Sequence, residues 1–150
     1  MPFLFIFFIF LAGCHSSPPS YSYFNPKLPE EASHSFSLLA KVAQIEKQDF
    51  PNIRIETLAK DKLSSHHLVV IREQEPLHYH AKHDAWALVL KGEADFILGD
   101  NRIRLVPGSA VYIPRGVHHQ ATRRGKGALA AFVIFTPPYD GKDMVPVEKE

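Results

Sequence analysis

Apolar and polar residues alternate along much of the chain after residue 52, in short runs separated by glycine and proline. The clearest run is Ile53-Arg54-Ile55-Glu56-Thr57-Leu58. Strand side chains point alternately to the two faces of a sheet, so this period predicts a strand with one buried face. The other expected strands are residues 67–72, 84–90, 94–98, 102–106, 110–113, 117–122 and 128–135.

Turn signals separate these runs at a spacing of roughly eight to twelve residues. Gly99-Asp100-Asn101 is typical of a hairpin, and Pro107-Gly108 and Pro114-Arg115-Gly116 indicate further turns. About eight or nine short strands at this spacing favour an antiparallel sandwich or barrel, and a jelly roll is the natural closed form because it protects the strand edges. The expected fold class is therefore all-β.

Residues 33–48 follow a different period from the strands. Their apolar positions fit one face of a short amphipathic helix, and Ser35 or Ser37 could cap its N-terminus. The apolar positions are Phe36, Leu38, Leu39, Val42, Ala43 and Ile45.

The chain begins with the apolar run MPFLFIFFIF, followed by Leu11-Ala12-Gly13-Cys14. This run is too short to span a bilayer as a helix but is typical of a signal-peptide core. The ending Leu-Ala-Gly-Cys resembles the lipobox of bacterial lipoproteins, although no lysine or arginine precedes the run. The resemblance implies cleavage before Cys14 and lipidation of its thiol.

Three parts of the chain are expected on these grounds: a lipoprotein signal peptide at 1–13, a tether at 14–32 and a folded domain at 33–150. The tether is rich in proline and serine and has no periodicity. The resemblance implies one partner, a membrane reached through two or three acyl chains, and a location in the cell envelope. His15 follows the cysteine, which implies the periplasmic face of the outer membrane if the source is Gram-negative.

Charge and cysteine content narrow the function classes. The formal net charge is +1 and no long run has one sign, so nothing in the electrostatics points to nucleic acid. Cys14 is the single cysteine, which excludes an intrachain disulfide. Nine histidines in 150 residues is a high count and directs attention to imidazole chemistry.

Histidines are concentrated at His78-Tyr79-His80, about forty residues ahead of His119. Two histidines one residue apart on a strand point to the same face. A third from a distant strand can complete one face of a metal site, since neutral imidazole binds zinc, copper, iron and nickel.

Two segments resemble the conserved motifs of the cupin superfamily. They are residues 76–92, PLHYHAKHDAWALVLKG, and residues 108–119, GSAVYIPRGVHH. Gly108, Pro114, Gly116 and His119 match the second motif at every spacing, although Arg123 stands at its usual asparagine position. The resemblance covers roughly residues 53–136. It implies a small single-domain cupin of the cupin 2 type, with a jelly-roll or double-stranded β-helix barrel after the short N-terminal helix.

The resemblance implies one divalent transition metal (iron, manganese, zinc or nickel) held by His78, His80 and His119. The family glutamate falls on Ala85, and Asp84 stands one position earlier. Asp84 is included as a candidate ligand, although alternation aims it away unless a bulge turns it inward. Two alternatives remain: three histidines with water, and a defective site. His83 is a further nearby donor.

The sequence is consistent with three hypotheses about function. The first is a membrane-tethered metalloenzyme, dioxygenase-like or isomerase-like, acting on a small polar substrate. The second is a non-catalytic metal-binding or small-ligand-binding lipoprotein, and the third a structural envelope protein. Whether the chain is an enzyme is left open, and the resemblance implies a homodimer as one expected assembly.

Small and large residues alternate where the first motif meets its strand. Ala85 and Ala87 would leave volume for a small ligand if they face inward. Trp86 and Tyr112 are expected to pack in the core.

Overall fold

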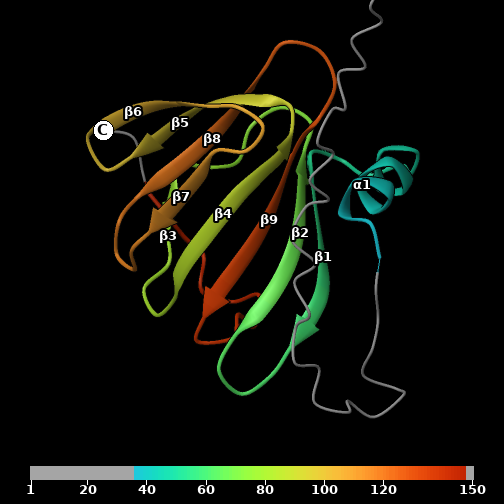
Figure 1. The fold of residues 1–150 in the computed structure, drawn as a ribbon. Helices are drawn as coiled ribbons and strands as arrows, with labels where there is room; N and C mark the ends of the chain where they lie inside the picture. The colour runs from blue at the N-terminus through green and yellow to red at the C-terminus, as the bar shows by residue number, and fades with distance from the viewer. Residues whose placement is uncertain (1–35, 148–150) are drawn as a thin grey trace, which may run out of the picture. The chain divides into compact units, whose positions relative to one another are not determined.

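The computed structural model describes residues 36–147, which form one helix and ten strands in two antiparallel sheets (Figure 1). The first sheet has the order β1-β2-β9-β4-β7, and the second has the order β10-β3-β8-β5-β6. The first contains β1 (Ile53–Lys60), β2 (Ser65–Ile71), β9 (Leu129–Thr136), β4 (Asp84–Lys91) and β7 (Ala110–Ile113). The second contains β10 (Val145–Pro146), β3 (His78–Tyr79), β8 (His119–Arg124), β5 (Glu93–Leu98) and β6 (Asn101–Leu105).

The main hydrophobic core lies between the two sheets. Alternation along each strand sends one set of apolar side chains into this space, as the period of two predicts. The core includes Ile71, Ala85, Val89, Ala94, Phe96, Leu105, Val111, Ile113, Ala121, Leu129, Val133 and Phe135. The predicted all-β jelly-roll fold is confirmed.

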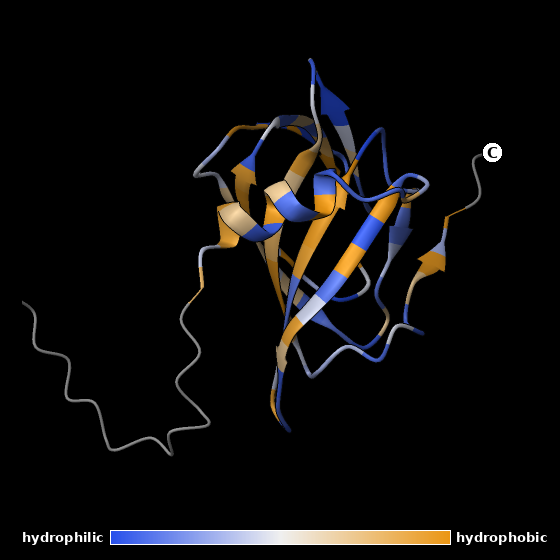
Figure 2. Cartoon of the chain, turned by 90° about the vertical axis from the view of Figure 1, so that its right-hand side faces the viewer, coloured by the Kyte–Doolittle hydropathy of each residue, from blue (hydrophilic) through white to orange (hydrophobic). Residues whose placement is uncertain are grey.

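A second, smaller core lies on the outer face of the first sheet, under helix α1 (Leu38–Glu46; Figure 2). The Ser37 side chain caps the helix by accepting a hydrogen bond from the Ala40 N–H at 3.2 Å. Val42 and Ile45 are buried against residues whose side chains point outward from β2 and the β9 region. Those outward residues are Leu68, Val70, Ala128 and Ala130. The predicted short N-terminal helix is therefore confirmed, with Ser37 as its cap.

The rest of that outer face departs from expectation. Ala85 and Ala87 point inward, so Trp86 must point outward, and it is 54% exposed. Tyr112 lies opposite Trp86 on β7 and is 43% exposed. The expectation that both aromatics pack in the core is wrong, because the helix packs on β2, on Ala130 and on the Leu90 end of β4, and leaves Trp86 and Tyr112 uncovered.

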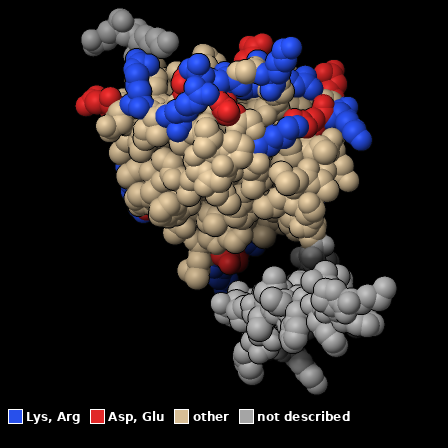
Figure 3. Space-filling model, turned by 45° about the horizontal axis from the view of Figure 1, so that its top comes forward, with Lys and Arg blue, Asp and Glu red and all other residues tan. Residues whose placement is uncertain are grey.

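Charged groups are unevenly distributed over the surface. Figure 3 shows lysine, arginine, aspartate and glutamate gathered along one edge of the visible face, with few over the rest of it. Among the residues described, no helix is both long and apolar enough to cross a membrane. The expected signal peptide, the tether and Cys14 lie outside the described residues.

Candidate metal site

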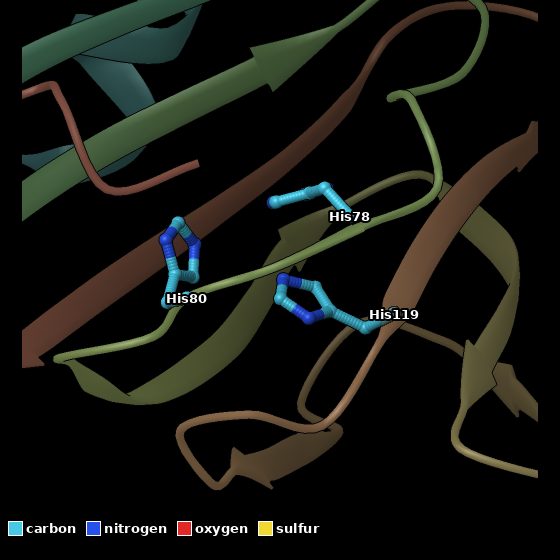
Figure 4. Close-up of side chains that lie close together, drawn as sticks. All are labelled: His78, His80 and His119. Atoms are coloured by element: carbon cyan, nitrogen blue, oxygen red, sulfur yellow. The ribbon is translucent and has the colours of Figure 1, made fainter. Parts of the chain in front are cut away.

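Three of the four predicted ligands meet in one place. His78 is on β3, His80 follows β3 directly, and His119 begins β8 (Figure 4). His78 pairs directly with His119 across the two strands. All three are buried, and one ring nitrogen of each lies within 4.8 Å of those of the other two.

Main-chain carbonyls determine which ring nitrogen of each histidine is free. The Nδ1 atom of every ring lies within hydrogen-bond distance of a carbonyl oxygen. A carbonyl only accepts, so Nδ1 must carry the proton, and the lone pair is left on Nε2. The acceptors are Pro76 for His78 at 2.8 Å, Asp143 for His80 at 2.6 Å and Val117 for His119 at 3.1 Å. Metal-binding histidines are commonly oriented in this way.

Burial keeps these rings neutral. It lowers the pKa of His78 and of His80, and together with the neighbouring His78 it lowers the pKa of His119 to about 3. Neutral imidazoles with free Nε2 lone pairs are the form that binds a metal. The three histidines therefore fit a divalent transition metal as a donor set.

The C-terminal segment supplies an orienting residue that the sequence did not reveal. Asp143 accepts hydrogen bonds through its carboxylate from the Ala81 N–H at 3.2 Å, the Lys82 N–H at 2.8 Å and the His83 ring at 2.6 Å. Its main-chain carbonyl also holds His80. One residue thus fixes the turn that follows the two histidines of the first motif, and His83 is an orienting neighbour of the site.

The second motif is tied to the first by its glycine. The Gly116 N–H donates to the His80 carbonyl at 2.7 Å, and Gly116 has a φ of +77°, which a residue with a Cβ rarely adopts. The turn before β8 therefore positions His80 as well as His119.

Asp84 does not join the cluster, and the expectation of a fourth ligand there is not met. Its carboxylate accepts hydrogen bonds from the main-chain N–H of Arg115 at 2.9 Å and from the Arg115 guanidinium. The side-chain and main-chain hydrogen bonds of Arg115 hold the pKa of Asp84 at about 2. The strand is regular here, since Ala85 points inward and no bulge separates it from Asp84. Alternation therefore keeps the carboxylate outside the barrel.

A cavity of about 130 Å³ lies inside the barrel beside the histidines. Most of its wall is aliphatic, and Ala85 and Ala87 both line it, as expected if they face inward. The acidic residue Glu75 also lines it. No motif singled out Glu75, because it lies ahead of β3 where the sequence has no clear period.

Comparison with known proteins agrees with this architecture. The family model described as "Cupin domain" matches residues 67–135. An uncharacterized protein of Aquifex aeolicus (strain VF5) is 40% identical over 84 residues, which is 56% of this chain and 69% of that relative. This chain is a cupin.

Solved structures resemble this cupin in fold. An uncharacterized conserved protein with a double-stranded β-helix domain from Klebsiella pneumoniae has a TM-score of 0.65 at 18% identity, covering 83% of this chain and all of that one (100%). KdgF from Halomonas sp. has a TM-score of 0.55 at 26% identity, covering 62% of this chain and 88% of that one.

Proposed function

We propose that this cupin binds one divalent transition metal through the Nε2 atoms of His78, His80 and His119, and acts as a small metalloenzyme. The observation that carries the proposal is the common orientation of the three rings. Each Nδ1 faces a carbonyl, which leaves three Nε2 lone pairs in one buried space. Three protein ligands leave coordination positions open, which is typical of catalytic rather than structural metal sites.

The donor set narrows the choice of metal. Imidazole suits iron, zinc and nickel, whereas manganese favours carboxylate and water oxygens. Because Asp84 is hydrogen-bonded to Arg115, no carboxylate from the described part of the chain joins the cluster, which favours iron, zinc and nickel. A metal bound there would supply a Lewis acid or an oxygen-activating centre. The protein's own contribution is to hold three neutral imidazoles and to shield a small molecule from bulk water in the cavity.

Elemental analysis of the purified full chain tests this proposal. We expect close to one metal ion per chain, lost in the His78→Ala/His119→Ala double variant. His118→Ala is the matched control, since it removes the adjacent histidine outside the cluster. Absence of metal from the wild-type chain after reconstitution with iron, zinc and nickel would contradict the proposal.

We also propose that the domain is tethered to a membrane of the cell envelope through lipidated Cys14. The support is the apolar run ending in Leu-Ala-Gly-Cys. The wild-type chain should incorporate labelled palmitate and sediment with membranes, whereas Cys14→Ser should do neither. Equal labelling of the two would rule out attachment at Cys14. A homodimer stays a prediction, which sedimentation of the purified chain tests.

A further inference from the structure

Among the described residues 36–147, Glu75 is the only carboxylate that lines the cavity. Its main-chain N–H donates to the Ala121 carbonyl at 3.0 Å, and its Oε1 accepts from the Ala121 N–H at 2.7 Å. The Gln120 side chain donates to the Glu75 carbonyl at 2.9 Å. Glu75 is therefore held against β8, the strand that begins with His119, and one oxygen of its carboxyl group already has a partner.

The remainder of the cavity wall limits which ligand fits. Apart from the three histidines, Glu75 and Tyr139, the lining side chains are apolar, and none is lysine or arginine. A phosphate or a second carboxylate on the ligand would find no cation there, and several hydroxyls would lose their water partners. A dry cavity of about 150 Å³ can hold benzene, so the volume of about 130 Å³ corresponds to a ligand of similar size.

We propose that the cavity takes a small molecule with an apolar body, whose oxygen-bearing end lies between the three histidines and Glu75, and that Glu75 hydrogen-bonds to that end. This inference rests on the proposed metal site. It replaces the small polar substrate expected from the sequence, because a polar body would face aliphatic walls contributed by both sheets.

The protonation of Glu75 suits this role. In the metal-free chain, burial raises its pKa to about 7, against the effect of the Ala121 N–H, so both forms are populated near neutral pH. The titratable groups that share the cavity are His78, His80, His119 and Tyr139, and the strands of the first sheet contribute none. In the metal-free chain, burial keeps the three rings neutral and raises the pKa of Tyr139, so no charged side chain lining the cavity stabilises the ionised carboxylate.

Binding of two size-matched probes to the zinc-loaded full chain tests the proposal. Benzohydroxamate has an apolar ring and metal-binding oxygens, whereas tartrate has a polar body. Titration calorimetry should give at least about tenfold tighter binding of benzohydroxamate. Glu75→Leu, which has no polar side-chain atom, should weaken it by about three- to tenfold, the usual range for one hydrogen bond, whereas Glu75→Gln, whose NH2 group can still donate, should bind as wild type does.

Two further variants keep the test independent of how the Glu75 variants fold. Ala87→Phe fills the cavity and should retain zinc while losing benzohydroxamate. Glu56→Gln is the matched control, since Glu56 pairs with Lys41 outside the barrel, and it should bind as wild type does.

The outcomes separate this inference from the proposed function. If the wild-type chain does not bind zinc, the metal site itself fails and the inference fails with it. The proposed ligand class is overturned if zinc binds but tartrate binds as tightly as benzohydroxamate does. It is also overturned if Ala87→Phe binds zinc and benzohydroxamate as tightly as wild type does. If Glu75→Leu binds benzohydroxamate as tightly as wild type does, or Glu75→Gln weakens binding as much as Glu75→Leu does, the hydrogen-bonding role of Glu75 is overturned. In these last cases the metal site stands.

Discussion

Glu75 links the chemistry of the cavity to the stability of the domain. Burial raises its pKa from 4.5 to about 7. Between these values the folded chain retains a proton that the unfolded chain has released, so stability falls as the pH rises through this window and is level above it. At about 1.4 kcal/mol per pKa unit, the loss is on the order of 3 kcal/mol.

Glu75→Gln should remove this pH dependence, because glutamine keeps an acceptor for the Ala121 N–H and does not titrate. The metal-free variant should match the metal-free wild type near pH 4.5 and exceed its free energy of unfolding by up to about 3 kcal/mol near pH 8. Urea unfolding across this range measures the difference. A difference that is constant with pH would show that Glu75 has an ordinary pKa.

Gly92 and Gly108 allow the cost of backbone strain to be distinguished from the cost of a steric clash. Gly92 and Gly108 both have a positive φ, of +78° and +89°. A Cβ on Gly92 would lie 2.6 Å from the Ala128 carbonyl oxygen, whereas one on Gly108 would have no atom within 4 Å.

Gly108→Ala should therefore cost only the strain of the left-handed conformation, about 1–2 kcal/mol. Gly92→Ala should cost about 1–3 kcal/mol more, because the backbone at Ala128, directly before β9, must move as well. The free energies of unfolding of the two variants test this order. Equal losses would mean that the backbone near Ala128 shifts at little cost, and that Gly92 is needed only for its positive φ.

The C-terminal segment is part of the metal site although it contains none of the ligands. It pairs through β10 with β3, and Asp143 binds the turn after His80 through both its carboxylate and its carbonyl. Groups that orient metal-binding histidines commonly contribute about 10- to 100-fold to metal affinity.

Asp143→Ala should lower zinc affinity by about tenfold or more, because the turn holding His80 and His83 loses its carboxylate. Competition with a chromogenic chelator measures the change. Asp140→Ala is the matched control, since the Asp140 carboxylate accepts only from the nearby Lys142 N–H among the described hydrogen bonds. Equal zinc affinity in the two variants would assign Asp143 a purely structural role.

The two sheets together bury the three histidines and so allow them to bind a metal at low pH. By excluding water from the rings, they lower the pKa of each of the three histidines below 6.5. Protons compete with a metal only where the imidazoles become charged.

Metal should therefore remain bound as the pH falls past 6.5, and its loss should have a midpoint well below that value. Dialysis of the zinc-loaded chain at a series of pH values, followed by elemental analysis, measures this midpoint. Release centred at or above pH 6.5 would indicate histidines that are open to solvent.

Much of the barrel could be predicted because its pattern is local. The period of two from Ile53 onward identifies strands whose inward residues must share a core, and the glycine and proline turns set their lengths. The same local logic explains why Ala85 and Ala87 face the cavity. This logic failed for Trp86 and Tyr112. An aromatic residue fits a strand equally well on a covered and on an exposed face of the sheet, and the position of α1 determines which face is covered.

The three histidines could be named from their spacing, whereas their partners could not. His78 and His119 meet because β3 and β8 pair, and motif spacing is sufficient to anticipate this. Asp84 could not be excluded without knowing that Arg115 faces it from 31 positions away. Asp143 is 60 residues beyond His83, and Glu75 faces Ala121 at a separation of 46. Such contacts depend on how distant strands register and on how much water the packed sheets exclude. The periodicity of a sequence specifies neither the register of distant strands nor the exclusion of water, because both are set only when the barrel closes.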